Sequence, residues 1–96
     1  MIVSATSINA PFVLTGMVKS YEASGGGPNS CLFSFYVTDG AQDASFQLRG
    51  DTPPAMFAAM AVIVAAAYAA STTLIQITSF ERLNSGVYLV NLIRGA

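Results

Sequence analysis

CLFSFYVTDGAQDASFQLR, residues 31–49, is the stretch that decides the fold. Large apolar side chains alternate with mostly polar ones on both sides of Asp39-Gly40, a dipeptide typical of tight turns. The pattern predicts a β-hairpin with one apolar face and one mixed face. The mixed face carries Tyr36, Gln47 and Arg49, and we expect a ligand to bind there. The apolar face, which we expect in the core, holds Cys31, Phe33, Phe35, Val37, Ala44, Phe46 and Leu48.

The residues before the hairpin predict one more strand and a loop. Residues 12–21, FVLTGMVKSY, alternate again, and Gly16 in the middle predicts a bend or bulge that lets one strand serve two sides of a barrel. Residues 22–30, EASGGGPNS, predict a connecting loop. The triple glycine does not predict a phosphate-binding loop, because no Lys follows it and the next element is a strand.

Residues 53–70 predict a helix, with Asp51 or Thr52 as its cap and Pro53 in its first turn. Helical spacing gathers bulky residues on one side, which we expect to close one end of a barrel, and alanines on the other, which meet solvent or a second copy of the chain. A membrane span is disfavoured, because the apolar run 55–70 is only about 24 Å long as a helix. The bulky side holds Met56, Phe57, Met60, Ile63, Val64 and Tyr68; the opposite side holds Ala58, Ala61, Ala65 and Ala69.

Two more strands are predicted after the helix. Residues 71–80 alternate, with Ile75 and Ile77 on one side and Leu74, Gln76, Thr78 and Phe80 on the other. Residues 81–86 predict a turn with Gly86 in the left-handed conformation, and residues 87–94, VYLVNLIR, predict the last strand.

Composition restricts the function. The 96 residues form one domain, 1–96, and 53% apolar with only 9% charged residues predicts self-association. The net charge is −1, so the chain has no dense basic patch of the kind that nucleic-acid binders normally carry, and no polybasic membrane-binding segment. The amino terminus, MIVSATSINAPF, lacks the pattern of a secretory signal, and we expect a cytoplasmic protein.

The residues needed for catalysis and metal binding are scarce. Cys31 is the only cysteine and there is no histidine, so neither an internal disulfide nor a zinc site is expected. Asp39 and Asp43 flank a turn and are interpreted as turn formers. We therefore predict no enzymatic activity and no cofactor.

The predicted order of elements, three strands, a helix and two strands, is that of the OB-fold. Two segments resemble small OB-fold single-stranded-DNA-binding proteins: VLTGMVKSYEASGGGPNSCLFSFYV, residues 13–37, and LIQITSFERLNSGVYLVNLI, residues 74–93. That group includes the bacterial single-strand binding protein, the primosomal replication protein and phage or plasmid versions. The resemblance implies a mainly β fold, a five-stranded Greek-key barrel with one helix between strands three and four, and a role in DNA replication.

The resemblance also implies a binding site on the outer face of the first three strands. In this hypothesis, bases of single-stranded DNA, or alternatively of RNA, stack on Tyr21 and Tyr36. The protein binds as a dimer or tetramer and without sequence preference. Lys19 and Arg49 contact phosphates, and Arg82 adds a third contact. Strand alternation independently places the strand residues of this set away from the core: Thr15, Lys19, Tyr21, Ser34, Tyr36, Gln47 and Arg49.

Two alternatives stay open. In the first, the barrel is a protein–protein assembly module that does not bind nucleic acid, and the tyrosines lie under a loop or in a subunit contact. In the second, the ligand is an oligosaccharide, which OB barrels also bind.

Overall fold

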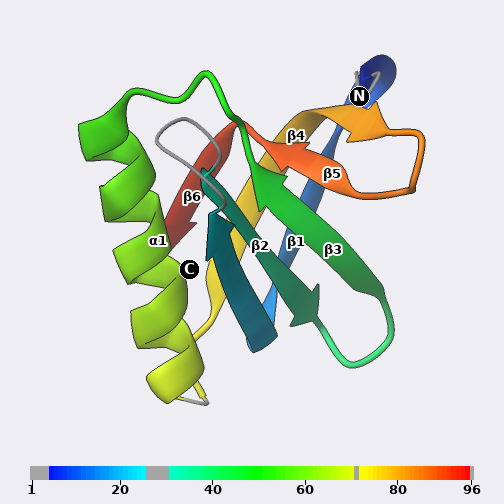
Figure 1. Ribbon diagram of the computed structural model, residues 1–96. Coiled ribbons are helices and arrows are strands. Elements are labelled where there is room, and N and C mark those ends of the chain that lie inside the picture. Colours follow the sequence, from blue (N-terminus) through cyan, green and yellow to red (C-terminus); the bar gives the residue numbers. More distant parts are fainter. Residues whose placement is uncertain (1–4, 26–30, 71, 96) are drawn as a thin grey trace.

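The computed structural model describes residues 5–25, 31–70 and 72–95 (Figure 1). Its elements, in chain order, are β1 (Ala5–Gly25), β2 (Cys31–Thr38), β3 (Asp43–Leu48), α1 (Pro54–Ala69), β4 (Ile75–Leu83), β5 (Tyr88–Val90) and β6 (Leu92–Gly95). The prediction of a mainly β fold with one helix between the third and fourth strands is confirmed.

Five strands form a ring. Their order is β1-β2-β3-β5-β4, and β4 pairs back with β1. The β3–β5 pairing is parallel and the other pairings are antiparallel. This is the arrangement expected of an OB-like sheet, in which the chain returns from β4 through a short turn to close the ring.

The last predicted strand, residues 87–94, is interrupted at Asn91 and forms β5 and β6. The Asn91 backbone N–H donates to the Thr78 carbonyl (2.9 Å), and its side-chain Oδ1 accepts from the Phe80 N–H (2.9 Å). The asparagine therefore keeps the backbone of β4 hydrogen-bonded at the break, and β6 continues along β4 beyond it.

Gly16 is the point where β1 changes partners. β1 pairs with β4 up to Gly16 and with β2 from Met17 onward. A Cβ at position 16 would lie 2.3 Å from the carbonyl oxygen of Thr38, a distance that no side chain tolerates. The predicted role of Gly16, a bend that lets one strand serve two sides of the barrel, is confirmed.

The core fills the inside of the ring. Six of the hairpin side chains predicted to be apolar and inward are buried: Phe33, Phe35, Val37, Ala44, Phe46 and Leu48. They pack with Leu14 and Val18 of β1, Ile75 and Ile77 of β4, and two residues of α1. Cys31 begins β2, and the burial of its side chain lies outside the described residues.

The predicted packing face of the helix is partly wrong. α1 lies along one side of the ring against β1 and β6 (Figure 1). The side chains that contact the core are Phe57, Met60, Ala61, Val64 and Ala67, whereas Met56, Ile63 and Tyr68 are exposed. The contacting face includes two alanines because a small side chain lets the helix approach the sheet closely.

The predicted helix cap is also wrong. No side chain caps the first turn, which follows Pro53 and has Pro54 as its first residue. The fixed φ angle of proline favours a helix start at this position without a capping hydrogen bond. The Asp51 carboxylate instead accepts hydrogen bonds from Arg49.

Several strand boundaries differ from the prediction. β1 begins at Ala5, seven residues before the predicted start at residue 12. β1 extends through Gly25, so residues 22–25 are strand and not loop; residues 26–30 of the predicted loop lie outside the described residues, as does Ser71. β4 begins at Ile75 and continues to Leu83, so the turn is shorter than predicted. Gly86 does adopt the predicted left-handed conformation, with φ of 93°.

Candidate nucleic-acid interface

The outer face of β1, β2 and β3 carries two rows of polar side chains. Directly opposite residues on antiparallel strands lie on the same face of a sheet. Ser20, Tyr36 and Ser45 are opposite one another and form the first row, and Glu22, Ser34 and Gln47 form the second. Two residues of β-strand separate the rows, a distance of about 7 Å.

A hollow of about 490 Å³ lies over these two rows. All six residues of the rows line it, together with Tyr21 of β1, Phe35 of β2 and Val87 from the segment before β5. Tyr36 is the only aromatic residue in the rows, and its neighbours within its row are both serines. Tyr36 is half-buried, and because serine is small, its row leaves part of the ring open to the hollow.

Hydrogen bonds fix the position of Tyr36. Its hydroxyl donates to Asp43 Oδ2 (2.7 Å), and the Thr38 hydroxyl donates to Asp43 Oδ1 (2.6 Å). The bonds from Thr38 and then Tyr36 lower the pKa of the Asp43 carboxyl, and the same bond to Asp43 raises the pKa of the Tyr36 hydroxyl. The ring is therefore held at its outer end by a charged acceptor.

Asp39 shapes the turn beside this site, as predicted. Its Oδ1 accepts from the backbone N–H groups of Gln42 (2.6 Å) and Ala41 (2.9 Å), and these bonds lower the pKa of its carboxyl. Gly40 follows with φ of 98°, a conformation that favours glycine.

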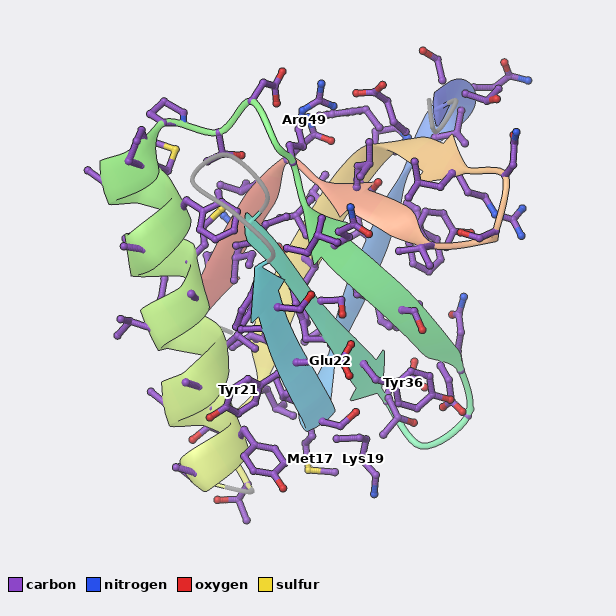
Figure 2. The ribbon with its side chains drawn as sticks, in the orientation of Figure 1. Met17, Lys19, Tyr21, Glu22, Tyr36 and Arg49 are labelled. Carbon is purple, nitrogen blue, oxygen red and sulfur yellow. The ribbon has the colours of Figure 1, made fainter. Side chains whose placement is uncertain are left out.

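The predicted orientation of Tyr21 is wrong. The pairing of β1 with β2 shifts between Val18 and Ser20, so Lys19 is an extra residue in a β-bulge. After the bulge Tyr21 is opposite Phe35 and therefore lies on the core side of the sheet. Its ring centroid is 5.8 Å from that of Phe33 and 5.3 Å from that of Tyr68 on α1. Figure 2 shows Tyr21 beside the helix and Tyr36 away from it.

A signal for this bulge is present in the sequence. Before Lys19 the inward positions are even-numbered, as in Leu14 and Val18, whereas after it the polar residues Ser20, Glu22 and Ser24 occupy the even positions. When the polar residues of one strand move from odd-numbered to even-numbered positions, an extra residue has been inserted between the two parts. The same shift is the reason that Ser20 and Glu22 belong to the site and were not predicted.

Arg49 lies at the far end of β3 and is held by two carboxylates. Its Nε donates to Asp51 Oδ1 (3.0 Å), and its Nη1 is ion-paired with Glu81 of β4. The bond from Arg49 lowers the pKa of the Asp51 carboxyl. A phosphate would have to compete with both acids for this guanidinium.

The remaining predicted residues divide between the site and other surfaces. Ser34, Tyr36 and Gln47 line the hollow together, and Lys19 is exposed in the bulge near Asp43. Arg82 lies over the Tyr88 ring, with Cζ 5.5 Å from its centroid. Thr15 accepts a hydrogen bond from Gln76 on the β1–β4 side of the ring. Tyr21, although on the core side of the sheet, also lines the hollow. The lining residues that were not predicted are Ser20, Glu22, Phe35, Ser45 and Val87.

Within residues 5–25, 31–70 and 72–95, no three His, Cys, Asp or Glu side chains gather in a way that would hold a metal ion. The described helix lacks the combination of length and hydrophobicity that a membrane crossing requires. Comparisons with protein-family models, with curated proteins and with solved structures give no match to this chain.

Proposed function

We propose that this protein binds single-stranded nucleic acid, in the first place DNA, across the outer face of β1, β2 and β3. The observation that carries the proposal is the hollow over the two polar rows, with the hydrogen-bonded Tyr36 ring in it. Aromatic rings on an exposed sheet are the stacking platforms that OB barrels offer to bases. The closed ring of strands, with its OB-like order, supports the same assignment.

Each group in the hollow has a chemical role in the proposal. A base stacks on Tyr36, and the hydroxyl and amide groups of Ser34, Ser45 and Gln47 form hydrogen bonds with base edges, which present both donors and acceptors. Lys19, at the bulge, contacts a phosphate. None of the described residues that line the hollow is a cation, so binding depends on salt much less than in strongly basic binders, because few counterions are released.

Titration of a fluorescently labelled single strand of mixed sequence, followed by anisotropy at low salt, tests the proposal. Tyr36→Ala should weaken binding roughly tenfold, because it removes the stacking surface. Tyr68→Ala is the matched control, because Tyr68 is a half-exposed tyrosine outside the hollow. Absence of binding by the unaltered protein at micromolar concentration, or equal losses in the two variants, would contradict the proposal.

A second candidate function, assembly with another copy of the chain, is favoured by α1. The 16 residues of this helix include no charged side chain, and the exposed ones are apolar, with Val62 at 66% exposure. A helix that is apolar all round is normally buried. In a twofold contact each helix meets its own copy, and a helix without charges brings no like charges together.

Light scattering with and without a single strand tests the assembly. Val62→Lys places a charge at the centre of the outer helix face and should convert the assembly to monomers. Val13→Lys is the control, because Val13 is a comparably exposed valine on β1. If the unaltered protein is monomeric, assembly is excluded. The proposal of nucleic-acid binding does not depend on that result.

A further inference from the structure

A carboxylate lies inside the proposed binding site. Glu22 is exposed on β1 and lines the hollow, directly opposite Ser34 and one row away from Tyr36. Within the described residues no side chain forms a hydrogen bond or an ion pair with it. Figure 2 shows Glu22 projecting over the same face as Tyr36. This is an unusual group for a surface that contacts nucleic acid, because it repels phosphate.

The position of Glu22 determines which part of a nucleotide can approach it. A base stacked on Tyr36 directs one edge toward the second row, about 7 Å along the strands. There the edge meets Glu22, which only accepts hydrogen bonds, and Ser34 and Gln47, which both donate and accept. The phosphates avoid the carboxylate and lie toward Lys19, so the bases point into the hollow.

From this geometry we infer that the site discriminates among bases: it favours cytosine and adenine, whose amino groups N4 and N6 occupy equivalent positions on the base edge, over thymine and uracil. The inference rests on the proposed function. Cytosine presents an N4 amino donor where thymine and uracil present an O4 acceptor. The carboxylate accepts a hydrogen bond from the amino group. Opposite O4, by contrast, a carboxylate oxygen and O4 are both acceptors, and no hydrogen atom lies between them.

Oligo-dC and oligo-dU separate the two classes of base most cleanly. Both are pyrimidines, and neither carries the methyl group of thymine, so the amino and keto groups at position 4 are the main difference between them. Anisotropy titration at mildly alkaline pH, where cytosine is neutral, should give roughly threefold to tenfold tighter binding to oligo-dC, a modest effect because water competes for an exposed carboxylate.

Glu22→Gln tests the assignment to this side chain, because glutamine keeps the size and adds a donor for O4. The dC to dU affinity ratio should fall to about one in this variant. Asp51→Asn makes the same change of net charge outside the hollow and should keep the ratio. A ratio near one in the unaltered protein, or a ratio that survives Glu22→Gln, would overturn the inference while binding itself stands. Absence of binding to either strand would instead overturn the proposed function.

Discussion

The outer face of the β1–β3 sheet and the outer face of α1 are opposite in chemistry. The sheet face carries hydroxyl, amide and carboxylate groups around one fixed tyrosine ring and is hollowed. The helix face carries alanine, valine, isoleucine and methionine, without a charge. In the two proposals, the polar sheet face contacts a soluble ligand, and the uncharged helix face contacts another copy of the chain.

The largest effect is expected from Gly16→Val, because both faces depend on the course of β1. The new side chain would overlap the Thr38 carbonyl, so we expect a loss of about 3 kcal/mol or more in the free energy of unfolding. Gly50→Ala is the control, because a Cβ at position 50 contacts nothing within 4 Å. Urea denaturation followed by circular dichroism measures both. Equal stability of the two variants would contradict the described bend.

Tyr21→Ala tests the difference between Tyr21 and Tyr36, the two tyrosines that the sequence predicts to stack on bases. Tyr21 packs against Phe33 and Tyr68 and is 43% exposed, so its removal should cost about 1 to 2 kcal/mol of folding free energy. Tyr21 lines the hollow from the core side, so binding to a single strand should fall less than in Tyr36→Ala. Thermal unfolding and anisotropy on the same samples separate the effects. A large loss of affinity with unchanged stability would return Tyr21 to the ligand side.

The salt dependence of binding distinguishes the two cations at opposite ends of the site. Lys19→Ala should reduce the slope of log K against log salt by about one, because one phosphate contact is lost. Arg49→Ala should leave the slope nearly unchanged, because Asp51 and Glu81 already neutralise the guanidinium. Titrations across a range of salt concentrations give both slopes. A slope reduced by Arg49→Ala alone would show that phosphate displaces the carboxylates.

The smallest effect concerns the bond between Tyr36 and Asp43. The folded-state pKa of Asp43 is lowered, so its contribution to stability is present above the unfolded pKa of about 3.9 and is lost as the pH falls through the folded value. The pKa of Tyr36 is raised, so its contribution is present below the unfolded pKa of about 10 and is lost as the pH rises through the folded value. Asp43→Asn should weaken both dependences, measured by urea midpoints and by ultraviolet titration of tyrosine.

The fold was largely predictable because its signals are local. Alternation identified the hairpin core, Gly16 identified the bend, and Gly86 identified the last turn. The packing face of α1 was not predictable, because the helix is apolar on every side and its hydrophobicity indicates no preferred face.

The site was only half predictable, and the reasons are specific. Ser34, Tyr36 and Gln47 follow from the alternation of the hairpin. The reorientation of Tyr21 and the inclusion of Glu22 depend on one inserted residue in β1, which a uniform alternation cannot represent. The neutralisation of Arg49 depends on Glu81, 32 residues away along the chain, and no local pattern connects the two.

The extra residue at position 19 determines which β1 side chains lie on the outer face of the sheet, beside the hollow. Loss of a single codon there would exchange the two sides of the following segment, turning the Tyr21 ring to the outer face of the sheet and the Glu22 carboxylate to the core side. A lineage that gained or lost this one residue would present a different ligand surface on an unchanged scaffold, with every other side chain conserved.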